Sequence, residues 1–416
     1  MKNFTFKVVG EASVRLFSSL FVLLLARFVG AAEFGRYSSA FAFASIFTIF
    51  VDLGTGAIVT REIARHSDRQ QHILHTTHSL KVLSALGALL LIHFLSPFFA
   101  VSKDKTTLVD ALGVVVITYT LLDYFCSMLT GKEDMKWEAL LKVVCRGIIF
   151  LIGIGAILIH ASLAGIGLSM AAGAFVSYGI GVQIVRYRFG SFHYEIQLDT
   201  LRFLLRSCLP LFGSVFFWAF YDNQDVLLLN HFRVPDNQIG YFAAAIKMID
   251  VLKVYPVLLV GVFFPSLSRL SLGHSSDFLK RAHRLMRFMG VSAFPLALLI
   301  YVLAPFIMVL LYGESYSSAT PLLRNLLPAF LGISLNHLFM HVLIARDQEG
   351  TLFVGSIIAC LSNLLMSWVL IPLYGSLGVC YALVGSELMY SAFQGYLVHR
   401  TVPGFFSLTV FSSHAD

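Results

Sequence analysis

Long apolar stretches recur along the whole chain at a spacing typical of membrane-spanning helices. A helix needs about 20 mainly apolar residues to cross the hydrocarbon core of a bilayer. Windows of this kind cover residues 8–29, 35–60, 80–101, 107–130, 139–160, 163–186, 207–230, 239–264, 288–312, 320–345, 350–373 and 377–399. The pattern predicts an all-α polytopic membrane protein with about twelve transmembrane helices.

The short connections between these windows alternate in charge. Lys and Arg gather at the N-terminus, in the loops near 61–81, 131–142, 186–206, 266–287 and 346–349, and in the C-terminal tail. The intervening loops hold only Arg36, Lys103, Lys105 and Arg233. Because cytoplasmic loops carry an excess of Lys and Arg, the alternation predicts that both termini are cytoplasmic and supports an even number of spans.

The composition agrees with a membrane protein. Of the 416 residues, 57% are hydrophobic and 13% are charged, whereas soluble domains carry about 25% charged residues. The net charge of +7 follows the alternate loops and does not indicate nucleic-acid binding. The N-terminus resembles a signal peptide, but Glu11 and Arg15 interrupt it, so an uncleaved first span is expected. The five cysteines lie in apolar segments without a CxxC pair, which predicts small buried side chains rather than disulfides or a metal site.

Two short segments recur about half a chain apart. "FGRYSSA" at 34–40 aligns with "IGYFAAA" at 239–245, and "SLAG" at 162–165 resembles "SLG" at 376–378. Six spans in each half predict two lobes of the same orientation, related by a pseudo-two-fold axis along the membrane normal with a cleft between them. The expected organisation is a first lobe at 1–190, a cytoplasmic linker at 191–206, a second lobe at 207–400 and a cytoplasmic tail at 401–416.

Two groups of charged residues interrupt the apolar spans of the second half. Asp222 and Asp225 are three residues apart and so share one face of a helix. A carboxylate in hydrocarbon costs at least about 2.5 kcal/mol. Lys247, Asp250 and Lys253 form a stripe about 9 Å long, in which one acid leaves one lysine in surplus. We expect the stripe to face a cavity or another helix, and the two aspartates to face the cavity between the lobes near Lys247 or Arg324. A buried ionic clamp that orients two helices is the alternative.

The remaining intramembrane charges have simpler interpretations. Arg27, Asp110 and Arg324 lie near span ends, where they can reach the interface. Glu11 and Arg15 stand four residues apart on the first span, which favours a local ion pair.

Histidines and sequence motifs provide no sign of an enzyme. His337 and His341 lack the glutamate and third ligand of a zinc site, so they predict a hydrogen-bonded helix face. His72, His75 and His78 predict the solvated side of a surface helix. Walker, nucleophile-elbow and dinucleotide-binding motifs do not occur, and neither ATP hydrolysis nor a cofactor is expected.

The segment "ARFVGAAEFGRYSSAFAFASIFTIFVDLGTGAIVTREIARH" resembles the first two helices of polysaccharide and O-antigen repeat-unit flippases, within the multidrug/oligosaccharidyl-lipid/polysaccharide exporter superfamily. The matching positions are Arg27, Gly30, Phe34, Gly35, Arg36, Tyr37, Asp52, Leu53, Gly54 and Arg61. Further matches are "DVLLL" with "IGYFAAAIK", "LYGESYSSATPLLRNL" and "NLLMSWVLIPLYGSLGVCYALVGSE". Together they cover nearly the whole chain.

The resemblance implies a two-lobed bundle that works by alternating access. Its members move a polyprenyl-pyrophosphate-linked oligosaccharide from the cytoplasmic to the outer leaflet of the cytoplasmic (inner) membrane, as a step in O-antigen or other surface polysaccharide biosynthesis. A cationic central cavity receives the pyrophosphate and sugars, and the lipid tail stays in the bilayer. Polysaccharide polymerase and chain-length proteins are the implied protein partners.

The resemblance also assigns candidate roles. Lys247 matches the family's basic residue after Tyr-x-x-Ala, Asp225 its aspartate before Leu-Leu, and Arg324 its Leu-Arg. The candidate substrate-binding bases are Lys247, Lys253, Arg324 and Arg146. The candidate ion-coupling or clamp carboxylates are Asp222, Asp225, Asp250 and Glu387. These carboxylates would bind a coupling ion, H⁺ or Na⁺, and compete with the substrate for the lysines, which would couple ion movement to substrate release.

Two other functions compete with this interpretation. A multidrug or small-molecule cation antiporter of the same superfamily needs a mainly apolar cavity with carboxylates, and the six intramembrane bases disfavour it. A membrane glycan polymerase or ligase needs an external domain or a long loop, whereas the predicted external loops have about ten residues or fewer.

Overall fold

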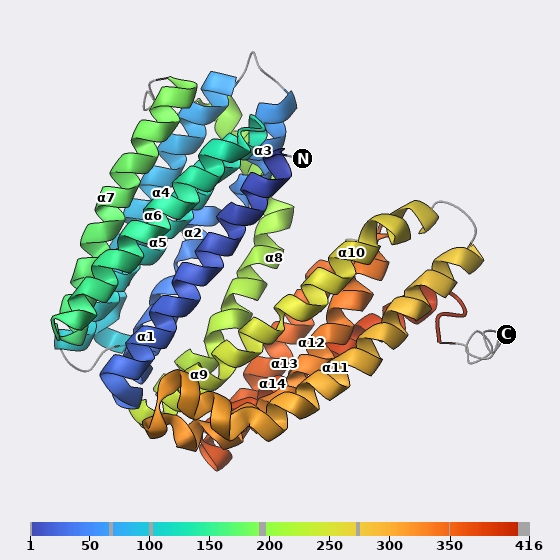
Figure 1. Cartoon of the computed structure of the whole chain (residues 1–416). Helices are drawn as coiled ribbons and strands as arrows, with labels where there is room; N and C mark the ends of the chain where they lie inside the picture. The colour runs from blue at the N-terminus through green and yellow to red at the C-terminus, as the bar shows by residue number, and fades with distance from the viewer. Residues whose placement is uncertain are drawn as a thin grey trace. The chain divides into compact units, whose positions relative to one another are not determined.

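The computed structural model describes residues 2–65, 70–99, 103–190, 197–271, 275–348 and 350–406, and regular structure in these ranges is helical throughout (Figure 1). The first helices are α1 (Lys2–Ile46), α2 (Thr48–Asp52), α3 (Thr55–Arg65), α4 (Gln70–Phe99), α5 (Lys103–Gly131), α6 (Met135–Leu158), α7 (Leu163–Phe189) and α8 (Leu198–His231). The others are α9 (Asp236–Leu252), α10 (Val254–Ser271), α11 (Ser275–Tyr312), the 3₁₀ helix η1 (Glu314–Ala319), α12 (Thr320–Ile344), α13 (Gly350–Tyr374) and α14 (Ser376–Thr401). The predicted all-α class is confirmed.

Many of these helices are long and apolar enough to cross a bilayer. Eight helical stretches of the described chain meet this condition, and a ninth does if the bent pair Asp199–Cys208 and Phe212–His231 forms one span. Large apolar side chains stay exposed on them; Phe98 is 89% and Val291 74% accessible, as a lipid-facing surface requires. The chain is a multi-pass membrane protein. Helix lies at each of the twelve predicted windows, but twelve crossings and cytoplasmic termini stay predictions.

The chain reverses direction inside α1. Gly30 has φ 79° and ψ 171°, a conformation outside the helical region that suits glycine. The rings of Phe21 and Tyr37, on either side of it, lie 6.2 Å apart, whereas sixteen residues of continuous helix would separate them by about 24 Å. In Figure 1 the chain accordingly runs down from the N-terminus and then back up toward α3. The predicted windows 8–29 and 35–60 fall on the two sides of this turn.

The chain divides into two compact units, Met1–Leu227 and Leu228–Asp416, with the boundary inside α8. The expected linker lay earlier, at 191–206, and residues 191–196 of it fall outside the described residues. The two six-helix lobes and their symmetry axis stay a prediction.

Close approach of helices through small residues builds the core of each unit. In the first unit, a Cβ on Gly153 of α6 would come within 2.6 Å of the Phe21 ring of α1. In the second, a Cβ on Gly378 of α14 would lie 2.2 Å from the carbonyl oxygen of Leu370 of α13. Glycine therefore lets α1 pack on α6, and α14 on α13, at distances that no larger residue permits.

The predicted topology can be tested by labelling single cysteines. Lys132 and Asn237 are exposed and follow helices α5 and α8, whereas the five native cysteines are buried and can be replaced first. We expect an impermeant maleimide to reach Lys132→Cys only in inside-out vesicles and Asn237→Cys only in intact cells. Labelling of both positions from one side would contradict the twelve-span topology.

Candidate functional site

The charged stripe of the second unit lies at the end of α9. Lys247 Nζ is 3.0 Å from Asp250 Oδ2, and Lys253 Nζ is 2.9 Å from Asp250 Oδ1. Each carboxylate oxygen therefore binds a different lysine, and the three groups together carry one surplus positive charge. Their side chains are 34–48% exposed, so they remain accessible within an otherwise apolar segment.

A helix break fixes the position of this stripe. Helix α9 ends at Leu252, and Lys253 is its C-cap. Pro256 follows four residues after Leu252 and has no N–H to donate to the Leu252 carbonyl. The sequence thus stops the α9 hydrogen-bond ladder directly beside the two lysines.

Arg324 is held on a different pair of helices. Its Nε donates to the carbonyl oxygen of Tyr301 at 3.0 Å, and its guanidinium lies 4.8 Å from the centroid of the Tyr301 ring. These contacts join α12 to α11. The described contacts therefore do not bring Arg324 together with Lys247, and its role in substrate binding stays a prediction.

Glu387 lies at the contact between α14 and α12. It is buried, its Oε2 accepts a hydrogen bond from Asn336 Nδ2 at 2.6 Å, and its backbone oxygen accepts one from the Ser391 hydroxyl at 2.8 Å. A Cβ on Gly332 would lie 3.1 Å from the Glu387 Cβ, which shows how closely the helices approach. This is the geometry of a helix clamp; ion coupling at Glu387 is untested.

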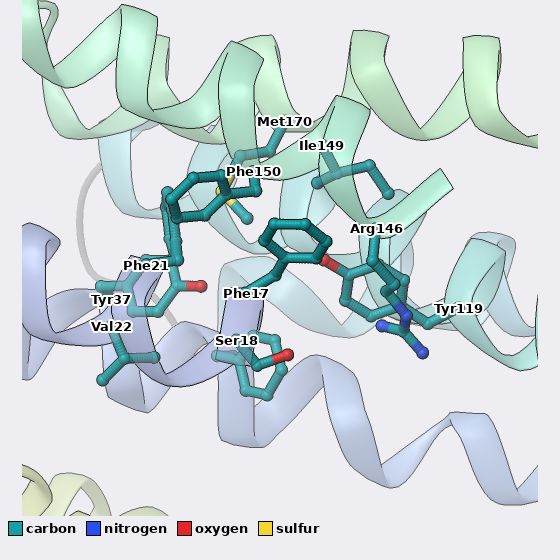
Figure 2. A pocket seen from close by; sticks show the side chains of 11 residues that line it. Phe17, Ser18, Phe21, Val22, Tyr37, Tyr119, Arg146, Ile149, Phe150 and Met170 are labelled. Carbon is teal, nitrogen blue, oxygen red and sulfur yellow. The ribbon is translucent and has the colours of Figure 1, made fainter. Parts of the chain in front are cut away.

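Arg146 of the first unit closes one side of a small half-open pocket (Figure 2). Its guanidinium lies 3.4 Å from the centroid of the Tyr119 ring, and one terminal nitrogen is 3.5 Å from Asp123 Oδ1. The Arg146 side chain is 11% exposed. Aromatic rings dominate the pocket walls: Phe17, Phe21, Tyr37, Phe41, Tyr119 and Phe150.

Asp222 and Asp225 differ in their surroundings although both lie on α8. Asp225 is buried, at 7% accessibility, whereas Asp222 is exposed. Both belong to the first unit and Lys247 to the second. Their predicted proximity to Lys247 or Arg324 therefore stays a prediction.

Lys81 is a buried charge at the boundary between the predicted cytoplasmic loop near 61–81 and the predicted window 80–101. It is 1% exposed, and its Nζ donates to the carbonyl oxygens of Val51 at 2.6 Å and Asp52 at 2.8 Å. The Asp52 carboxylate lies 3.6 Å away. The chain leaves the helical conformation just after α2, at Leu53 (φ 52°) and Gly54 (φ 70°). The Asp-Leu-Gly motif thus ends a helix whose open carbonyls are capped by an ammonium group.

A signal for Lys81 was present in the sequence. Thr77, Ala85 and Ala88 lie on the same face of α4, at positions i−4, i+4 and i+7, and all are buried. Small residues around one lysine indicate a face in close contact with another helix.

Glu138 is a second buried charge that was missed. Its Oε1 binds Lys7 at 2.6 Å and Lys142 at 2.7 Å, and Lys142 also binds Glu11 at 2.6 Å. The predicted pair of Glu11 with Arg15 is therefore wrong. Because α1 packs closely on α6, a lysine of the facing helix reaches the Glu11 carboxylate.

The histidine predictions had different outcomes. His341 Nδ1 lies 2.8 Å from the His337 carbonyl oxygen, in agreement with a hydrogen-bonded helix face. His78 is buried against the rings of Tyr124 and Phe125, at centroid distances of 6.5 and 6.0 Å. A solvated face is thus wrong for His78, because this part of α4 packs on α5.

The chain is similar to known transporters. A family model described as "Polysaccharide biosynthesis protein" matches residues 1–271. Among curated proteins, none matches the chain.

Solved structures show the same fold. An inward-facing multidrug resistance MATE family transporter of the MOP superfamily aligns with a TM-score of 0.76 at 13% identity, over 96% of this chain and 98% of that one. The lipid II flippase MurJ in an inward closed conformation aligns with a TM-score of 0.75 at 14% identity, over 98% of this chain and 91% of that one. A MOP superfamily transporter from Pyrococcus furiosus aligns with a TM-score of 0.60 at 12% identity, over 96% of this chain and 94% of that one. The fold is that of MOP superfamily transporters.

The capping role of Lys81 predicts a stability effect. Lys81→Met keeps an unbranched apolar side chain, one atom shorter than lysine, but leaves two buried carbonyls without their donor, at a cost of about 1–3 kcal/mol. We expect a lower melting temperature in detergent than for the wild type, and no change for Lys136→Met, which alters an exposed lysine. Equal melting temperatures for Lys81→Met and the wild type would show that the cap is dispensable.

Proposed function

This chain belongs to the polysaccharide biosynthesis protein family, and from that premise we propose that it is a flippase for polyprenyl-pyrophosphate-linked oligosaccharides in the cytoplasmic membrane. The cargo class is the repeat unit of O-antigen or another surface polysaccharide, and the transport works by alternating access. The observation that carries the proposal is the accessible, net positive cluster of Lys247, Asp250 and Lys253 in an apolar segment.

The chemistry of this cluster suits a pyrophosphate diester. Such a group carries about two negative charges and cannot enter hydrocarbon without compensation. Lysine provides a flexible, strongly hydrated point charge that can move from one anion to another. Asp250 binds both ammonium groups, and a phosphate oxygen would replace it on Lys247, the more exposed of the two lysines.

The same exchange provides a route to release. When Asp250 competes with the phosphate for the lysines, any change that favours the carboxylate lowers substrate affinity. H⁺ or Na⁺ binding at other carboxylates would bias this competition. We assign the coupling role to Asp222, which is exposed, and a clamp role to Asp225, which is buried.

Multidrug transport is the second candidate, because a MATE transporter shares the fold as well as MurJ does. The name of MurJ states that it flips lipid II, a lipid-linked substrate. The family description and the surplus positive charge of the α9 cluster favour the flippase, since a site for organic cations has no use for extra bases.

Substitution of Lys247 tests the proposed phosphate contact. In a strain that lacks its own copy of the gene, we expect Lys247→Ala to abolish surface polysaccharide while the protein still inserts at a normal level. Lys247→Arg should retain part of the function, because the charge persists although its geometry changes. Lys136→Ala, an exposed lysine of α6, is the matched control and should export normally. Normal export by Lys247→Ala would remove this residue from the site.

The two aspartates of α8 should respond differently to neutralisation. Asp225→Asn should lower protein abundance, because a buried group loses its partner. Asp222→Asn should leave abundance unchanged and reduce the dependence of transport on pH or Na⁺. Protein level and flipping are measured on the same membranes. A double Asn variant that is normal in both would exclude both roles.

A further inference from the structure

The aromatic pocket of the first unit lies wholly within that unit and is built by α1, α5, α6 and α7 (Figure 2). The rings of Phe17 and Phe150 lie 5.3 Å apart, and those of Tyr37 and Phe41 stack at 5.9 Å. Such walls present flat apolar faces to whatever enters the pocket.

Polar groups converge on these walls. Figure 2 shows the hydroxyls of Tyr37 and Tyr119 on opposite sides of the Phe17 ring, with the Ser18 hydroxyl nearby and the Arg146 guanidinium against the Tyr119 ring. Tyr37 is 5% exposed, and its hydroxyl makes no hydrogen bond within the described chain. The side chain is thus mostly buried while its hydroxyl opens into the pocket, where a bound group can supply the missing partner.

A lipid chain does not suit this pocket. An isoprenoid segment would cover the Tyr37 hydroxyl and the Arg146 guanidinium without offering either a hydrogen bond. Each uncompensated buried polar group costs about 1–3 kcal/mol, and more if it is charged.

A pyrophosphate does not suit it either. The group carries about two negative charges, and the pocket offers one cation, Arg146, which already faces the Asp123 carboxylate at 3.5 Å. Aromatic faces also carry partial negative charge and repel an anion. A neutral group with both an apolar and a polar end fits better.

An acetamido group has an apolar end, its methyl group, and a polar end, its amide. Its methyl can pack against the Phe17 and Phe150 rings while its carbonyl oxygen accepts a hydrogen bond from Tyr37 or Arg146, which are donors. Its N–H can donate to the Tyr119 hydroxyl. We propose that this pocket, which we call the acetamido pocket, binds an N-acetylated sugar of the transported head group. The assignment rests on the proposed flippase function and adds a specificity subsite to it, in which Arg146 recognises sugar.

Saturation-transfer NMR on the full purified chain in detergent tests the pocket without transport. The probes are N-acetylglucosamine 1-phosphate and glucose 1-phosphate, which share the phosphate and differ in the acetamido group. We expect strong saturation of the acetamido methyl in the wild type, and at most weak saturation of glucose 1-phosphate. Equal saturation of the ring protons in the two sugars, without a methyl signal, would overturn the proposal.

Point variants test whether the acetamido methyl signal arises in this pocket. Tyr37→Phe keeps the ring and removes the hydroxyl, and we expect at least a threefold weaker methyl signal. Tyr187→Phe, at a 74% exposed tyrosine of α7, is the control and should match the wild type. Ser18→Trp fills the pocket mouth from an exposed position and should abolish the signal even if Tyr37→Phe does not fold. A methyl signal that survives Ser18→Trp would place the sugar elsewhere and overturn the proposal.

The failure of the flippase proposal remains distinguishable from the failure of this one. A pocket-dependent methyl signal in a protein that does not flip lipid-linked oligosaccharide supports the acetamido pocket and rejects the flippase. Flipping without a pocket-dependent signal supports the flippase and rejects the acetamido pocket.

Discussion

A charged side chain within an apolar helix is costly unless other groups compensate it, and much of the packing described here follows from that constraint. The charge of Lys81 is compensated by the carbonyl oxygens at the C-terminal end of α2, and this contact holds α4 against α2. Glu138 satisfies the same constraint through Lys7 and Lys142, which ties α6 to α1. In each case at least one partner lies on another helix, so the ionic contact also specifies which helices are neighbours.

Accessibility separates such structural charges from candidates for function. Lys81 and the Glu138 carboxylate are enclosed, with accessibilities of 1% and 2%, and exchange of partners there would break the core. The stripe of Lys247, Asp250 and Lys253 is compensated within one helix segment and stays 34–48% exposed. A substrate anion can replace Asp250 on these lysines without separating two helices. This difference, rather than charge alone, favours α9 as the place where a phosphate binds.

The part of the fold that sequence could predict is the part set by local periodicity. The apolar windows locate helices, and the spacing of three places Lys247, Asp250 and Lys253 together because all three share one helix. Contacts between helices were less predictable. Glu11 binds Lys142 rather than Arg15, because helix packing decides which base is nearer. Lys81 and His78 are buried although their neighbourhood in the sequence is polar, since the face of α4 that carries them packs against other helices.

The central claim is that the chain moves a lipid-linked oligosaccharide between leaflets, and a reconstituted flipping assay tests it most directly. Purified protein is placed in liposomes that contain a fluorescent polyprenyl-pyrophosphate oligosaccharide, and a membrane-impermeant enzyme cleaves the head groups that reach the outer leaflet. In protein-free liposomes the enzyme should cleave only the lipid that starts in the outer leaflet. With the protein present, the account predicts that nearly all of the lipid is cleaved, because flipping carries inner-leaflet lipid to the enzyme. Continued protection of the inner-leaflet lipid, in vesicles where the same protein transports a small organic cation, would contradict the account.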